Sequence, residues 1–128
     1  MDGSTQPDVT FERLHEIARA FARHDVDGIV NSFADDGEFR NAKGPDYWGQ
    51  SFKGKAAIRS YFEPLFASAS DVKWIHTSEF ICGNRAVTEW HRTATVKSGE
   101  KQSWLGCDLY TFRRGLIVMK DTYIKVVG

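Results

Sequence analysis

The residues of this sequence with the clearest capacity for chemistry are a carboxylate, Asp108, and a histidine, His91. Asp108 lies between the aromatic residues Trp104 and Tyr110. Desolvation by such neighbours disfavours the charged form of a carboxyl group and suits it to proton transfer. A histidine titrates near neutral pH, and an imidazole beside a carboxylate is a common acid–base pair. We therefore expect proton-transfer chemistry at Asp108, tuned by His91 or Glu89.

The alternative is a structural role for Asp108. The length of the turn before the last strand decides between this role and proton transfer. If the turn before the last strand has three residues, Asp108 lies opposite Lys120, and an ion pair would hold the carboxylate charged. If the turn has two residues, Asp108 lies opposite Asp121, and neighbouring carboxyl groups favour protonation of one of them. The sequence leaves both pairings open.

The first half of the chain is expected to supply the helices that pack against these strands. Apolar residues recur at spacings of three and four over 11–22, which predicts an amphipathic helix. A short second helix follows Asp25 and includes Phe33, and a third begins near Gly54 and ends or kinks at Pro64. A short strand over 38–41 and a glycine-rich loop over 42–52 lie between the second and third helices.

The pattern after Asp71 is that of a sheet. Segments rich in Val, Ile, Thr, Trp and Tyr are separated by turns at Gly83, Gly99 and Gly115, which predicts four long strands in an antiparallel meander. Helices followed by strands favour an α+β fold with one face of the sheet buried against the helices.

Turn lengths predict which strand residues lie opposite each other. Two-residue turns at the first two of these glycines set His76 opposite His91 and Glu89 opposite Asp108. Because residues two apart share a face, one face then carries polar groups among large aromatics. The members of this face are His76, Glu89, His91, Asp108, Trp74, Trp104, Tyr110 and Phe112, with either Lys120 or Asp121. Such a mixture indicates a pocket wall. The alternative is a solvated sheet face, because a one-residue bulge would exchange the two faces.

Composition excludes several classes of protein. The chain has 128 residues, 41% of them hydrophobic, which predicts one domain over 1–128. The 17 basic and 17 acidic residues cancel, so the basic face that nucleic acids require is not expected. The longest apolar run, 116–119, is far below the ~20 residues that span a membrane. Residues 1–8 lack the features of a secretory signal, and we expect a cytoplasmic protein.

Three segments carry a family resemblance that covers nearly the whole chain: FADDGEF at 33–39, FKGKAAI at 52–58, and GCDLYTF at 106–112 followed by GLIV at 115–118. In this order they resemble the nuclear transport factor 2-like superfamily, in particular its ketosteroid isomerase and SnoaL-like polyketide cyclase branches. The resemblance implies a cystatin-like cone, in which three N-terminal helices pack on a strongly curved antiparallel meander sheet around a small-molecule pocket. It also implies a homodimer.

The resemblance assigns roles to particular residues. The base of ketosteroid isomerases corresponds to Asn41, an amide without useful basicity, and their first-helix tyrosine falls on or beside Ile17. Asp108 matches the protonated Asp of those enzymes and the acid–base carboxylate of SnoaL-like cyclases. Classical ketosteroid isomerisation is therefore not expected, and Asp108 is the expected proton-transfer residue.

The expected ligand contacts come from both halves of the chain. Tyr47 and Trp48 lie in the glycine-rich loop, where they could close the mouth of a pocket over a flat ligand. The full set of expected binding residues is Ile17, Asn41, Tyr47, Trp48, Trp74, His76, Trp104, Tyr110 and Lys120.

We expect neither a cofactor nor a metal. Imidazole and carboxylate groups suit iron or zinc, but the superfamily seldom needs a metal. The four side chains concerned, His76, Glu89, His91 and Asp108, would come from three strands. Cys82 and Cys107 cannot make a disulfide framework or a four-thiolate zinc site, and we expect reduced thiols.

Together these observations predict a cofactor-independent isomerase, cyclase or dehydratase that acts by proton transfer on an apolar, carbonyl-bearing substrate. The alternative is a non-catalytic ligand-binding or assembly domain of the same fold, in which Asp108 is paired with Lys120.

Overall fold

The computed structural model describes residues 7–128. Its helices are α1 Phe11–Ala22, α2 Val26–Asn31 and α3 Lys55–Ser68. Its strands are β1 Phe33–Arg40, β2 Ser51–Lys53, β3 Lys73–Cys82, β4 Arg85–Thr95, β5 Lys101–Arg113 and β6 Leu116–Ile124. No helix within this range is long and apolar enough to cross a membrane.

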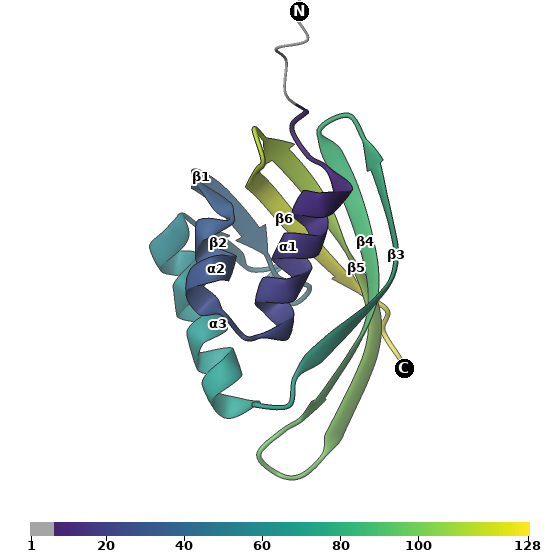
Figure 1. The fold of residues 1–128 in the computed structure, drawn as a ribbon. Coiled ribbons are helices and arrows are strands. Elements are labelled where there is room, and N and C mark those ends of the chain that lie inside the picture. The colour runs from purple at the N-terminus through teal and green to yellow at the C-terminus, as the bar shows by residue number, and fades with distance from the viewer. Residues whose placement is uncertain (1–6) are drawn as a thin grey trace, which may run out of the picture.

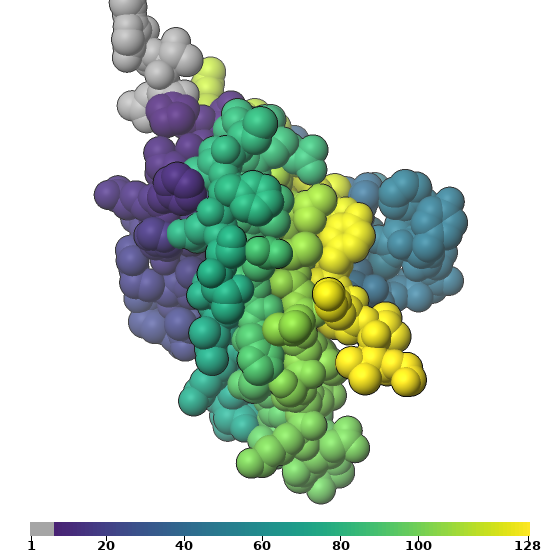
Figure 2. Space-filling model, turned by 90° about the vertical axis from the view of Figure 1, so that its right-hand side faces the viewer, coloured from purple at the N-terminus to yellow at the C-terminus, as the bar shows by residue number. Residues whose placement is uncertain are grey.

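The six strands form one sheet that curves around the helices (Figure 1). Their order is β2-β1-β6-β5-β4-β3, and β1 and β6 are the one parallel pair among these strands. The helices cover the inner face, to which the buried residues Ala86, Trp90 and Ala94 of β4 belong. The outer face is not covered by any described element (Figure 2). The expected α+β class, with helices packed on a curved sheet, is confirmed.

Local capping begins the first two helices where the sequence predicts them. The Thr10 side chain accepts a hydrogen bond from the backbone N–H of Arg13 and caps α1. Asp25 caps α2 in the same way through the N–H of Gly28. Leu14, Ile17 and Phe21 of the predicted apolar stripe are buried, whereas Phe11 at its start is 49% exposed.

The predicted end of the second helix is wrong, and so is the start at residue 38 that was predicted for the strand after it. The second helix ends at Asn31, and Phe33 is the first residue of β1, where it is fully buried and pairs with Ile117 of β6. Pro64 does not end α3, which continues to Ser68. Phe62 and Phe66 on either side of this proline are buried in the core, and such tertiary packing outweighs the lost backbone hydrogen bond.

Two hairpin registers differ from the predicted ones by one residue, within the β3–β4 pair and along the β4–β5 pair. The turn between β3 and β4 sets Cys82 opposite Arg85 as predicted, but a bulge between His76 and Ser78 moves His76 opposite Trp90. The loop between β4 and β5 contains three residues, 97–99, because the backbones of Val96 and Glu100 still pair. This extra residue sets Thr88 opposite Asp108, where we predicted Glu89.

Candidate ligand-binding site

A buried ion pair lies on the inner face of the sheet. Lys120 Nζ on β6 donates to Oδ1 of Asp108 on β5 at 2.9 Å, and the two side chains are 7% and 6% exposed. Thr122 Oγ1 donates to the same carboxylate oxygen at 2.6 Å. Trp90 Nε1 donates to the other oxygen, Oδ2, at 2.9 Å. Protein donors therefore occupy both carboxylate oxygens of Asp108.

Strand register accounts for this pair, although neither predicted register is correct. A two-residue turn and a bulge after Thr111 place Asp108 opposite Thr122. Lys120 lies two residues before Thr122 on the same face, and such diagonal neighbours are within reach of a long side chain. Asp121, the other predicted partner, alternates to the outer face.

Aromatic rings surround the ammonium group of Lys120. Its Nζ lies 4.7 Å from the ring centroid of Phe39, 5.3 Å from that of Phe21 and 6.0 Å from that of Phe62. The face of an aromatic ring attracts a cation at these distances. The charge of Lys120 is thus balanced by the Asp108 carboxylate and by neighbouring rings.

A pocket of about 250 Å³ opens beside this pair. We call it the larger pocket, to distinguish it from a smaller cavity on the same face of the sheet. It lies between α3, the segment 41–43 and the inner face of the sheet. Its lining combines aromatic rings with hydrogen-bond donors and includes no Asp or Glu among the described residues. The lining residues are Phe39, Asn41, Ala42, Lys43, Tyr61, Phe62, Leu65, Trp74, Trp90, Arg92, Trp104, Lys120, Thr122 and Ile124.

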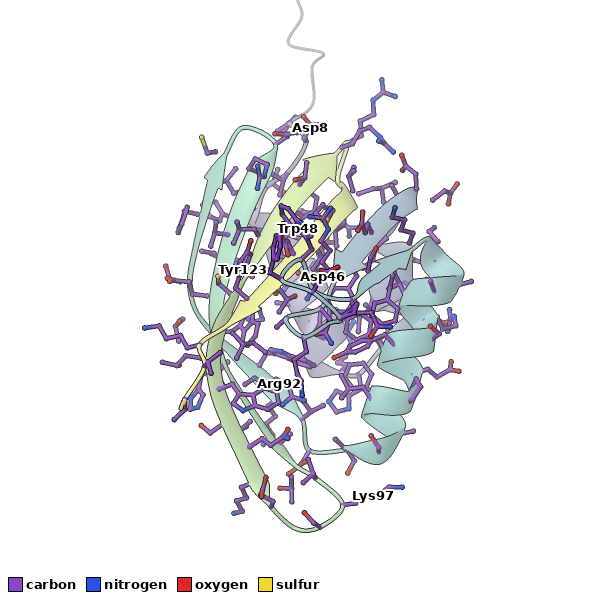
Figure 3. All side chains as sticks on the ribbon, turned by 180° about the vertical axis from the view of Figure 1, so that it is seen from behind. Asp8, Asp46, Trp48, Arg92, Lys97 and Tyr123 are labelled. Atoms are coloured by element: carbon purple, nitrogen blue, oxygen red, sulfur yellow. The ribbon has the colours of Figure 1, made fainter. Side chains whose placement is uncertain are left out.

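Arg92 stands in the wall of the larger pocket, in the space between the sheet and α3 (Figure 3). Its guanidinium carbon lies 4.5 Å from the ring centroid of Trp104 and 5.8 Å from that of Trp74. The residue is 8% exposed, and its Nη1 donates to Oε1 of Gln102 at 3.2 Å. Burial lowers the pKa of Arg92, as expected for a cation removed from water.

Tyr61 and Asn41 line the same pocket from α3 and from the segment that follows β1. Burial raises the pKa of the Tyr61 hydroxyl, while the Arg92 charge and the Asn41 side chain oppose that shift. The phenol therefore stays protonated at neutral pH and can donate a hydrogen bond to a ligand.

A second, smaller cavity lies on the α1 side of Lys120, with room for about one water molecule at about 10 Å³. Asp108, His76 and Tyr110 line it together with Thr88, whose buried hydroxyl has no hydrogen-bond partner among the described residues. His76 is exposed as a residue, but its side chain lines this cavity, and the partial loss of water around it lowers its pKa, although Asp108 and Glu79 oppose the shift. Burial also raises the pKa of Tyr110, and the charge of Asp108 adds to that effect.

The structure distributes the predicted binding residues over the two spaces. Asn41, Trp74, Trp104 and Lys120 line the larger pocket. Ile17, His76 and Tyr110 line the smaller cavity together with Trp74 and Lys120. Asp108 lines the smaller cavity and not the larger pocket, so it does not face a ligand bound in the larger one.

Glu89 and His91 do not join Asp108. In β4 the buried residues alternate as Thr88, Trp90 and Arg92, so both predicted acid–base partners lie on the outer face. The cause is the extra residue in the loop between β4 and β5, which moves the odd-numbered residues of β4 to the other side of the sheet. The expectation that they tune Asp108 is wrong.

Tyr47 and Trp48 do not close the larger pocket. They are 89% and 60% exposed and pack on each other with ring centroids 5.1 Å apart. Their segment projects from the body of the molecule (Figure 2). Its neighbours Asn41 and Lys43 line the pocket instead, and backbone hydrogen bonds between them and Gln50 close the base of the loop where it leaves β1.

Sequence reasoning missed Tyr61 and Arg92. Phe62 of α3 is buried in the core, whereas its neighbour Tyr61 is only partly buried and lines the pocket. Arg92 belongs to the even-numbered positions of β4 that the predicted register turned outward. The signal available in the sequence is Trp90, a large aromatic residue two positions before Arg92 that therefore shares its face of the strand.

Metal ligands are not assembled in the part of the chain that the structure describes. No group of three or more His, Cys, Asp and Glu side chains comes together there. His76 and Asp108 lie on the inner side, and Glu89 and His91 lie on the outer side. The four-residue set considered from the sequence is therefore split by the sheet.

The family model of the SnoaL-like domain matches residues 11–119. No curated protein matches the chain. A solved NTF2-like protein of unknown function from Burkholderia pseudomallei K96243 is 17% identical over 90% of this chain and 89% of its own, with a TM-score of 0.79. TerC, co-crystallised with polyporic acid, is 18% identical over 90% of each chain, with a TM-score of 0.78. A putative polyketide cyclase from Xanthomonas campestris pv. campestris is 18% identical over 88% of this chain and 87% of its own, with a TM-score of 0.77. At these identities the solved structures are evidence of a shared fold alone.

Proposed function

This chain belongs to the SnoaL-like domain family, and on that basis we propose that its larger pocket binds a compact, carbonyl-bearing small molecule. The observation that carries the proposal is the lining of that pocket. Donors from Asn41, Tyr61 and Arg92 meet aromatic rings there, and no carboxylate competes for these donors among the described lining residues. Carbonyl oxygens accept such hydrogen bonds, and a planar ligand would pack against the rings.

The size of the pocket narrows the ligand class. Its volume of about 250 Å³ is below the roughly 300–1,000 Å³ of most small-molecule sites, which favours a ligand of one or two rings. The similar structures include one that was co-crystallised with polyporic acid and one described as a putative polyketide cyclase. Both support an aromatic or polyketide-like compound as the ligand.

Binding without catalysis is the role that the contacts of Asp108 favour. The carboxylate is paired with Lys120 and hydrogen-bonded at both oxygens, and it does not line the larger pocket. The larger pocket offers hydrogen-bond donors but no described carboxylate or imidazole to act as a general base.

The test is ligand-observed NMR with 1-indanone and its matched control indane, which lacks the carbonyl group. We expect indanone to receive saturation from the protein and indane to receive much less. Ala42→Phe, which fills the larger pocket, should abolish the indanone signal, whereas Ala67→Phe on the exposed side of α3 should preserve it. Equal signals from both compounds, or an indanone signal that survives Ala42→Phe, would contradict the proposal.

Proton transfer is a second candidate, favoured by the smaller cavity. Asp108 there faces His76 and the unpartnered hydroxyl of Thr88 around a space the size of one water molecule. A substrate that reached this space could exchange a proton with Asp108 during an isomerisation, cyclisation or dehydration. In D₂O, the protein should then accelerate loss of the α-proton signal of 1-indanone. Exchange no faster than in buffer alone would exclude proton transfer by this protein to or from 1-indanone.

We also infer a homodimer that uses the outer face of the sheet. Ile75 of β3 lies opposite His91, which in turn lies opposite Leu105 of β5, so these residues form one row across three strands. Ile75 and Leu105 are more than half exposed, as is Tyr123 on β6. Burial of such a row against a second copy would remove apolar surface from water.

A further inference from the structure

Arg92 carries a buried charge for which the described part of the chain supplies no acidic partner. No carboxylate oxygen of residues 7–128 lies within 4.0 Å of its guanidinium group, and its side chain makes one hydrogen bond, to the neutral amide of Gln102. A guanidinium group has five N–H donors. Burial of a charge without a partner is costly, so the remaining donors are available to a group that enters from the pocket.

The larger pocket is basic as a whole. Lys43, Arg92 and Lys120 line it, and no described Asp or Glu does. The Lys120 charge is matched by Asp108 at 2.9 Å. Arg92 is then the buried cation of this lining that has no counterion among residues 7–128, and the exposed Lys43 adds positive potential to the pocket.

The tryptophans hold the guanidinium group in place before a ligand arrives. Trp104 packs on it at 4.5 Å and Trp74 at 5.8 Å. A guanidinium group held in a fixed plane presents a fork of N–H donors that matches the two oxygens of a carboxylate. The loss of side-chain entropy on binding is small for a group that is already fixed.

We propose that the larger pocket binds its ligand as an anion and that Arg92 pairs with a carboxylate of that ligand. This inference rests on the proposed function and specifies its ligand class as a compact aromatic carboxylate. The ring of the ligand packs among Phe39, Tyr61 and Trp90, and its acid group faces Arg92. Tyr61 and Asn41 remain available for a second oxygen of the ligand.

Isothermal titration calorimetry with 2-naphthoate and its neutral counterpart 2-naphthamide tests the proposal. We expect the wild-type chain to bind the anion at least tenfold more tightly than the amide. Arg92→Met, which keeps an unbranched apolar stem but removes the guanidinium group, should remove that difference. Arg59→Met, at a partly exposed arginine of α3 outside the pocket, should preserve it.

A measurement on the wild-type chain keeps the proposal falsifiable if Arg92→Met does not fold. The ¹⁵Nε signal of Arg92 should shift on addition of 2-naphthoate and stay unchanged with 2-naphthamide. Equal binding of anion and amide, or a preference that survives in Arg92→Met, would overturn the role of Arg92 and leave the proposed pocket standing. Absence of binding by both compounds would overturn the pocket function itself.

Discussion

Asp108 and Lys120 are two buried residues whose charges depend on each other. Lys120 donates to the carboxylate at 2.9 Å, and both side chains are almost inaccessible to water. Removal of one member of a buried ion pair leaves the other charge without compensation, which commonly costs about 3–5 kcal/mol. Substitution of Asp108 is therefore expected to lower the stability of the fold, whatever its effect on chemistry.

Asp108→Asn should lower the free energy of unfolding by several kcal/mol, about 3–5 by comparison with other buried pairs. The double variant Asp108→Asn/Lys120→Met should recover much of that loss, because no unpaired charge remains. Urea denaturation followed by circular dichroism measures both quantities. A single variant as stable as the wild type would contradict a structural role for the pair.

His76 has a different dependence on pH. Burial lowers its pKa from the ordinary value of 6.5, so between the two pKa values the unfolded chain binds more protons than the folded one. The free energy of unfolding should therefore rise as the pH rises through the window just below 6.5. His76→Gln should flatten that rise, and the ring protons of His76 should titrate below pH 6.5 in NMR spectra. Titration above 6.5 would show that the ion-pairing groups outweigh burial.

Among the elements, β4 and β5 decide how much of the site the sequence could reveal. Their content of Val, Ile, Thr, Trp and Tyr between turn glycines predicted two long strands, and both exist. The pattern could not distinguish a two-residue loop from a three-residue loop at Gly99, where a positive φ of 88° closes the longer one. Because the loop has one residue more than predicted, Thr88 lies opposite Asp108 where Glu89 was expected. Arg92 then lies on the inner face.

Bulges explain the remaining errors in the predicted site. A shift in β3 separates His76 from His91, and another in β6 places Thr122 opposite Asp108. Such shifts depend on side-chain packing across the sheet, which a local pattern of one strand does not contain. The helices were more predictable because caps and apolar spacing are local, and α1 begins and ends as the sequence indicates.

Gly106 on β5 allows Trp90 to reach Asp108. A Cβ at this position would lie 2.6 Å from the Trp90 ring and 2.5 Å from the backbone oxygen of Tyr123, so an added methyl group must displace the strand or the indole. Gly106→Ala should therefore lower the free energy of unfolding by about 1–3 kcal/mol, as overpacked cores do. Thermal denaturation measures the change, with the exposed substitution Ser103→Ala as control. Equal melting temperatures for the two variants would contradict this account of the contact.

At the scale of the whole molecule, the two faces of the sheet have different roles. The inner face holds the ion pair and the larger pocket, and the outer face carries exposed apolar residues around a shallow groove of about 390 Å³. Glu89 and Cys107 line that groove beside Leu105 and Tyr123. Family resemblance implies a dimer, and our inference that it uses the outer face rests on the exposed apolar residues there.

Leu105→Glu should convert the expected dimer into a monomer, because it places a charge in the apolar row of the outer face. Sedimentation velocity measures the state of association. Phe11→Glu, at an exposed apolar residue of α1, is the matched control and should leave the dimer intact. A wild-type chain that sediments as a monomer at all accessible concentrations would contradict the dimer.

We propose that the space between α3 and the inner face of the sheet receives an anionic aromatic ligand. A crystal structure of the chain grown with 2-naphthoate would locate such a ligand. We expect density for the ring among Phe39, Tyr61 and Trp90, with both carboxylate oxygens within hydrogen-bond distance of Arg92. An empty larger pocket, or a ligand seated there with its carboxylate turned away from Arg92, would contradict it.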